Sequence, residues 1–121
     1  YFRPFAGAIL AEDAVDYFDL TQDSPHMLIA VKAKRRAIAE APAVLHIDNS
    51  CRVQTVNSQS NPRLYRLLVE IKELTGTPIL LNTSFNVKGQ PVVNTASEAI
   101  STFLSTAIDA LVLEDLIFEK A

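Results

Sequence analysis

A run of small polar residues lies in the segment 80–91, with the sequence LLNTSFNVKGQP, and it has the side chains needed to bind a phosphorylated ligand. Hydroxyls and carboxamides both donate and accept hydrogen bonds, and a lysine next to a glycine brings an ammonium group and the backbone close to phosphate oxygens. The same residue types are common in turns and helix caps, and composition alone favours that structural role. The ligand-binding candidates in this segment are Asn82, Thr83, Ser84, Asn86 and Lys88.

Two arginines are further candidates. Arg52 lies in the segment 51–56, whose apolar and polar residues alternate as in a half-buried strand. This alternation predicts that Arg52, Gln54 and Val56 share one face of the strand. A guanidinium that faces a cleft binds a phosphate or carboxylate through two parallel hydrogen bonds, whereas one on an open sheet surface is only solvated. Arg3, in an aromatic stretch, has the same two alternatives.

Neither a metal site nor a covalent nucleophile is predicted. His26 and His46 lack a neighbouring histidine, cysteine pair or carboxylate at a spacing typical of metal ligands. The single cysteine, Cys51, fits a buried and unreactive thiol better than one activated by Arg52. With only three glycines in the chain, a glycine-built phosphate loop is not expected.

The clearest element that would position these residues is a helix over residues 62–75. Asn61 is a favourable N-cap, Pro62 suits the first helical position and Gly76 ends the helix. The helical period predicts one apolar face, made of Leu64, Leu67, Leu68, Ile71 and Leu74.

Shorter segments complete the predicted fold, a mixed α/β arrangement with a twisted open sheet. A capping box starts a second helix at Thr95, with an apolar face formed by Ala99, Ile100, Phe103 and Leu104. Short helices are expected over 11–18 and 34–41. Buried strands are expected at 27–31 and 79–81, strands at 110–113 and 116–118, and a hairpin from 44–47 and 52–56 around the turn 48–50.

Composition limits the class of protein. A chain of 121 residues with 49% hydrophobic and 21% charged residues predicts a single folded domain, 1–121, with one core and no need of disulfides. The net charge of -3 disfavours nucleic-acid binding, and no apolar run approaches the ~20 residues of a membrane span. A lone cysteine without a secretory signal favours the cytoplasm. The aromatic start at Tyr1 suggests a fragment whose upstream residues are missing.

Several segments spread over the chain together resemble the C-terminal domain of the O-carbamoyltransferases, the family of the nodulation and cephalosporin carbamoylating enzymes. His26 is a departure, because the family more often has an aromatic residue there. The similar segments are RPFA (3–6), SPHM (24–27), PAV (42–44), RVQTV (52–56) and the segment 80–91.

This resemblance implies a fold. Enzymes of the family resemble a fusion of an N-terminal, actin-like ATPase-type part that carries a metal ion with a C-terminal part similar to the threonylcarbamoyl-adenylate synthases, the YrdC-like fold. Residues 83–91, TSFNVKGQP, are similar to the synthase signature Thr-Ser-Ala-Asn-x-Ser-Gly-x-Pro, and Phe85 and Lys88 are departures from it.

The resemblance also implies site residues. Ser84 and Asn86 would contact the nucleotide or the carbamoyl group, and Arg52 the phosphate, with Arg52 and Ser84 as the catalytic pair. Arg3 corresponds more weakly to a basic residue near the phosphate site of the synthases.

The implied activity is formation of carbamoyl adenylate from carbamoyl phosphate and ATP with Mg²⁺, before the carbamoyl group passes to an acceptor hydroxyl in the N-terminal domain of the same parent chain. Positioning and charge neutralisation by Arg, Lys and Mg²⁺ would suffice for this chemistry. The 121-residue chain alone is then expected to be inactive, and a homodimer of the parent is left open. The alternative is a non-catalytic nucleotide-binding or interdomain docking module.

Overall fold

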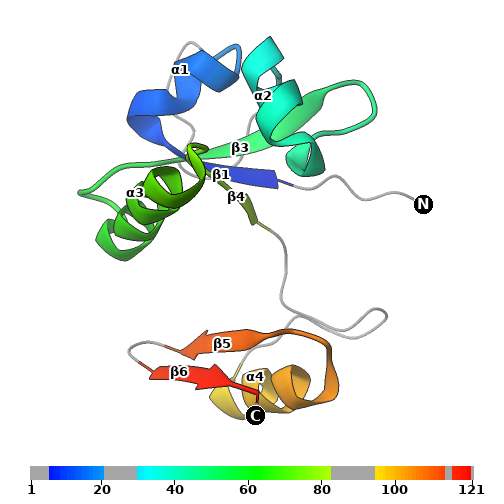
Figure 1. The fold of residues 1–121 in the computed structure, drawn as a ribbon, viewed down its shortest axis with the longest axis vertical. Coiled ribbons are helices and arrows are strands. Elements are labelled where there is room, and N and C mark those ends of the chain that lie inside the picture. The colour runs from blue at the N-terminus through cyan, green and yellow to red at the C-terminus, as the bar shows by residue number, and fades with distance from the viewer. Residues whose placement is uncertain (1–5, 21–29, 83–94, 114–115, 121) are drawn as a thin grey trace. The chain divides into compact units, whose positions relative to one another are not determined.

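The computed structural model describes residues 6–20, 30–82, 95–113 and 116–120. The chain divides into two compact units, Tyr1–Thr83 and Ser84–Ala121 (Figure 1). Within the described residues, no helix combines the length and the apolar character that a membrane crossing requires.

The first unit is built on a four-stranded mixed sheet with the strand order β2-β3-β1-β4. Strand β1 (Ala6–Leu10) lies between β3 (Ser50–Val56), to which it is parallel, and β4 (Ile79–Asn82), to which it is antiparallel. Strand β2 (Ala30–Lys32) pairs antiparallel with the other side of β3. The predicted mixed α/β fold is confirmed.

Helices cover both faces of this sheet (Figure 1). Helix α3 (Pro62–Thr75) buries Leu68 against one face. The other face is covered by two helices, α1 and α2, and the 3-10 helix η2, while a second 3-10 helix, η1, connects β1 to α1. Their bounds are Ala11–Asp13 for η1, Ala14–Tyr17 for α1, Arg35–Glu40 for α2 and Pro42–Val44 for η2. The short helices predicted over 11–18 and 34–41 are therefore confirmed.

Helix α3 has the predicted bounds, but its buried stripe is narrower than predicted. The Asn61 side chain accepts a hydrogen bond from the Leu64 N–H, and Gly76 ends the helix with a φ of 82°. Leu68 is fully buried, whereas Leu67 and Leu74 are 48% and 84% exposed. These two leucines are seven residues apart and so project from the same side of the helix, beyond the stripe that meets the sheet.

The hairpin predicted from residues 44–47 and 52–56 is wrong. Val44 ends η2, and the chain then turns through Asn49, whose N–H donates to the His46 carbonyl over 2.9 Å. The turn chemistry at 48–50 is therefore real, but no strand precedes it. Strand β3 instead takes β1 and β2 as its neighbours, so both of its edges are already paired.

Two strands predicted to be buried form the edges of the described sheet. Only residues 30–32 of the first strand are described, and Ala30 and Lys32 at its ends are exposed. In β4, Ile79 is buried whereas Leu81 is 47% exposed. An edge strand has a neighbour on one side only, so helices and strands cover it less completely.

The second unit packs helix α4 (Ala96–Ser105) against an antiparallel hairpin of β5 (Ala110–Leu113) and β6 (Leu116–Glu119). The predicted N-cap is confirmed, because the Thr95 Oγ1 accepts a 3.1 Å hydrogen bond from the Glu98 N–H. Leu104, predicted to be apolar core, is 69% exposed. The residues that close this small core are Ala99, Phe103 and Leu111.

Candidate functional site

Arg52 and Asn82 lie on the same face of the first unit's sheet. In the strand register, Ala6 of β1 pairs with Arg52 of β3 and with Asn82 of β4, so the three residues form one row across the sheet. Residues that pair across neighbouring strands project to the same face. The fold therefore brings together two of the residues predicted to bind ligand.

Gln54 lies on this face as well and contacts Asn82 directly. The Asn82 Nδ2 donates a 2.8 Å hydrogen bond to the Gln54 Oε1. Strand β1 separates the two residues, and the β1 residues in their rows are Ala6 and Ala8. Because alanine side chains are short, the two longer amides can meet above them. The hydrogen bond thus ties the end of β4 to β3.

The row of Arg52 is also where the other predicted site residues join the sheet. Residues 1–5 enter β1 at Ala6, and residues 83–94 leave β4 at Asn82. The two attachment points are directly paired. Five predicted residues belong to these segments and lie outside the described residues: Arg3, Thr83, Ser84, Asn86 and Lys88.

This face of the sheet has an apolar end and a polar end. The residues farther along β1 and β3, Leu10 and Val56, are buried in the cluster beneath Leu68 of α3. Arg52, at the other end, is exposed, and Gln54 and Asn82 are half-buried. The polar end therefore combines a positive charge with two carboxamides, a set that suits an anionic ligand carrying hydrogen-bonding groups.

Cys51 occupies the opposite face of β3 and is fully buried in the core with Val53. Burial raises the pKa of its thiol, and the nearby Arg52 charge opposes this only in part. A thiol with a raised pKa is a poor nucleophile at neutral pH. The predicted burial of Cys51 is confirmed.

A second polar cluster surrounds Glu40 at the end of α2. Its Oε1 accepts 2.8 Å hydrogen bonds from the Tyr17 hydroxyl and from the Thr77 hydroxyl, and its Oε2 accepts one of 2.8 Å from the Arg36 Nε. The Arg36 guanidinium also lies over the Tyr17 ring, 4.6 Å from its centroid. Hydrogen bonds from Arg36, Tyr17 and Thr77 lower the pKa of Glu40. These contacts join α1, α2 and the residues just before β4, so the cluster is structural.

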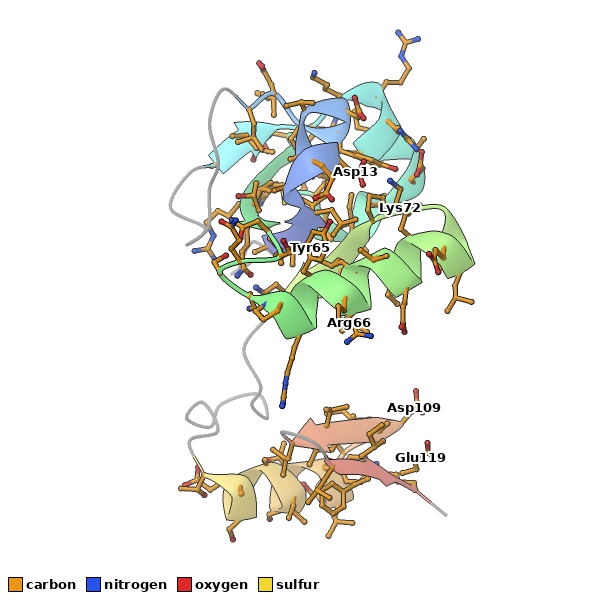
Figure 2. The ribbon with its side chains drawn as sticks, turned by 90° about the vertical axis from the view of Figure 1, so that its left-hand side faces the viewer. Asp13, Tyr65, Arg66, Lys72, Asp109 and Glu119 are labelled. Carbon is orange, nitrogen blue, oxygen red and sulfur yellow. The ribbon has the colours of Figure 1, made fainter. Side chains whose placement is uncertain are left out.

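Two acidic residues of the segment before α1 hold α3 in place. The Lys72 Nζ lies 2.8 Å from the Asp13 Oδ2, and the Tyr65 hydroxyl donates to the Glu12 carboxylate. Figure 2 shows Lys72 and Tyr65 on the side of α3 that faces Asp13. Among the residues placed by the structure, no three His, Cys, Asp or Glu side chains gather as a metal site would require.

Gln54 is predicted to share the face of Arg52, but it is not among the ligand-binding candidates predicted from the sequence. The signal was the alternation along β3, which assigns both residues to one face. The contact with Asn82 was not visible in the sequence, because it depends on which strand lies between them.

The family model and the relatives that the chain matches point to the same protein family. The chain matches the family model described as carbamoyltransferase C-terminus over residues 1–120. It is 40% identical, over 98% of its length, to an uncharacterized protein of Synechocystis sp., and covers 23% of that protein. It is 38% identical to nodulation protein NolO of Bradyrhizobium diazoefficiens, over 98% of this chain and 22% of that one. It is also 38% identical to nodulation protein U of Rhizobium tropici, over 74% and 16% of the two chains. The chain spans less than a quarter of the length of these relatives.

Proposed function

The chain belongs to the carbamoyltransferase C-terminal family, and from this premise we propose that it is the part of a carbamoyltransferase that forms carbamoyl adenylate from carbamoyl phosphate and ATP. The observation that carries the site assignment is the row of Arg52, Ala6 and Asn82. It places an exposed guanidinium beside the two points where the segments with the remaining candidate residues join the sheet. The acceptor hydroxyl would be bound by an N-terminal part of the same parent protein.

The proposed reaction needs positive charge more than it needs a nucleophile. Water releases phosphate from carbamoyl phosphate and leaves carbamate, whose oxygen then attacks the α-phosphorus of ATP while pyrophosphate departs. All these species are anions, so their mutual repulsion must be offset by cationic groups and hydrogen-bond donors. The Arg52 guanidinium can offer two parallel N–H groups to one phosphate. No bond to the protein forms, in keeping with the burial of Cys51 in the core.

The other candidates would act around this charge. Asn82, at the end of β4, would orient substrate by its carboxamide, and Mg²⁺ would enter as the ATP complex, held by phosphate oxygens. The metal ion expected from the family resemblance would be bound by the N-terminal part. The residues proposed to surround the nucleotide and the carbamoyl group are Arg3, Thr83, Ser84, Asn86 and Lys88.

The test uses the full-length parent protein with Arg52→Ala and Ser84→Ala. Carbamoyl-phosphate-dependent exchange of labelled pyrophosphate into ATP measures adenylate formation, and each variant should lose about 100-fold in rate, as expected when a charge-assisted contact is removed. Arg66→Ala is the matched control, because Arg66 is exposed on α3 and projects away from the strands (Figure 2). Undiminished exchange in both test variants would remove the site assignment.

A binding-only module would behave differently in calorimetry. If this part only binds nucleotide, titration of the parent protein with ATP will show binding that Arg52→Ala weakens, while exchange is absent in the unmodified protein. If it only docks against the N-terminal part, ATP binding will be unaffected by the substitution.

A further inference from the structure

We propose that Gln54 is a positioning residue of this site: it holds the Asn82 carboxamide, and with it the last residue of β4, in the geometry that substrate binding requires. The inference rests on the proposed function. Gln54 is not expected to touch the reacting atoms, and its effect is transmitted through Asn82.

The geometry of the contact between Gln54 and Asn82 supports this role. Gln54 and Asn82 are 28 residues apart in the sequence, yet the Asn82 Nδ2 donates to the Gln54 Oε1 over 2.8 Å. An isolated Asn amide can rotate about its terminal torsion and interchange its oxygen and nitrogen. By accepting from the Nδ2, the Gln54 Oε1 stabilises the orientation in which the Asn82 nitrogen faces Gln54. The amide oxygen of Asn82 then points to the other side.

The position of Asn82 in the chain gives its contact with Gln54 further importance. It is the last residue of β4, and the segment 83–91 that carries Thr83 and Ser84 begins directly after it. A hydrogen bond at the end of a strand restrains the last residue of that strand. Gln54 therefore holds Asn82, the residue that directly precedes in sequence the segment with the largest number of proposed ligand contacts.

Gln54 contributes little to the core. It is half-buried, whereas the apolar cluster on the same face consists of Ala8, Leu10, Val56 and Leu68. The side chain extends across β1 above Ala6 and Ala8 toward another polar residue. Its removal should therefore change the site more than the stability of the first unit.

The decisive experiment is a double-mutant cycle in the full-length parent protein, with Gln54→Leu, Asn82→Ala and the combination. Leucine is similar in size to glutamine and has no acceptor. We expect Gln54→Leu to lower kcat/KM for pyrophosphate exchange about ten-fold, the factor that corresponds to one neutral hydrogen bond. The double variant should be no less active than Asn82→Ala alone, because Gln54 acts only through Asn82.

Two further variants guard the interpretation. Gln59→Leu is the matched control, since Gln59 is exposed in the turn after β3 and its backbone N–H, not its side chain, donates to the Asn57 side chain. Its activity should equal that of the unmodified protein. If Gln54→Leu does not fold, as judged by circular dichroism, Gln54→Met replaces it in the cycle, because an unbranched thioether adapts to its surroundings more readily.

Each outcome has a defined consequence. Two results would overturn the role of Gln54 and leave the proposed function intact. One is a double variant whose loss of exchange activity equals the product of the two single losses. The other is a Gln54 variant whose exchange activity stays within two-fold of that of the unmodified protein. Absence of exchange in the unmodified parent would overturn the proposed function itself, and the role of Gln54 with it.

Discussion

Arg52 and Asn82 flank Ala6 in a single row of the sheet, one on each neighbouring strand. Two strand spacings separate their backbones, about 10 Å. Because the side chain of Ala6 between them is short, the polar groups of Arg52 and Asn82 dominate the chemistry of this part of the face. The row thus joins a charged group, an amide and the attachment points of two further polar segments.

The fork geometry of Arg52 should matter beyond its charge. Arg52→Lys in the parent protein keeps the charge but loses the pair of parallel donors. We expect the KM for carbamoyl phosphate in the exchange assay to rise about ten-fold, in line with the loss of one charge-assisted hydrogen bond. Arg66→Lys is the control. Arg66 is an exposed residue of α3, and its substitution should leave the KM unchanged. A KM unaltered by Arg52→Lys would show that the guanidinium does not bind the phosphate through two parallel hydrogen bonds.

The two classes of leucine on α3 should differ sharply in their effect on stability. Leu68→Ala removes a fully buried side chain and should cost about 2–5 kcal/mol. Leu74→Ala changes a side chain that is 84% exposed and should shift stability by less than about 0.5 kcal/mol.

The measurement is urea denaturation of the 121-residue chain followed by tyrosine fluorescence. All three tyrosines, Tyr1, Tyr17 and Tyr65, belong to the first unit, so the signal reports on that unit. Equal costs for the two leucine variants would contradict the assignment of the buried stripe.

The two glycines of the first unit's described residues should also respond differently to a methyl group. Gly76 has a φ of 82° and no atom within 4 Å of an added Cβ, so Gly76→Ala should cost about 1–2 kcal/mol through backbone strain alone. At Gly7 an added Cβ would lie 3.5 Å from Val44 and 3.6 Å from Ile79, which are ordinary contact distances. Gly7→Ala should therefore leave stability unchanged or raise it by up to about 1 kcal/mol. The same fluorescence assay decides, and a harmless Gly76→Ala would argue against the left-handed helix end.

Stability should fall in alkaline solution because of Tyr17. Burial, the hydrogen bond to Glu40 and the nearby Glu40 charge raise the pKa of Tyr17 to about 12 from its ordinary value of 10.0. The folded state thus favours the neutral phenol. Its contribution is fully present below about pH 10, the unfolded value, and is lost as the pH rises through about 12.

The comparison that isolates this effect is unfolding of the unmodified chain and of Tyr17→Phe, followed by circular dichroism from about pH 9 to pH 12. The phenylalanine variant keeps the packing and lacks the titrating hydroxyl. The difference in unfolding free energy between the two proteins should shrink as the pH rises. Tyr65 is present in both, so its own titration cancels. A difference independent of pH would contradict the raised pKa of Tyr17.

Features that depend on neighbouring residues could be predicted from the sequence. Asn61 and Thr95 cap their helices, and Gly76 adopts the left-handed conformation that ends α3. The alternation along β3 correctly separates buried Cys51 from exposed Arg52. Each of these features arises within a few residues of chain, where residue type and backbone conformation are directly linked.

Strand pairing and side-chain burial depend on which helices and strands pack together, and they could not be predicted in the same way. The apolar residues at 44–47 suggested a strand, but both edges of β3 are taken by β1 and β2. Leu67, Leu74 and Leu104 have helical spacing suited to burial, yet the described structure leaves all three exposed. Hydrophobic periodicity identifies the residues that can be buried, and the width of the surface they meet decides which of them are.

By itself the sequence determined the residue types available for binding, the caps and ends of the helices, and the face of β3 to which Arg52 and Gln54 belong. Only the tertiary structure decided that β1 lies between β3 and β4, which places Asn82 in the row of Arg52 and within 2.8 Å of Gln54. The physical reason is that strands pair through backbone hydrogen bonds, which are the same for nearly every residue type. The neighbour of a strand is therefore set by packing over the whole unit.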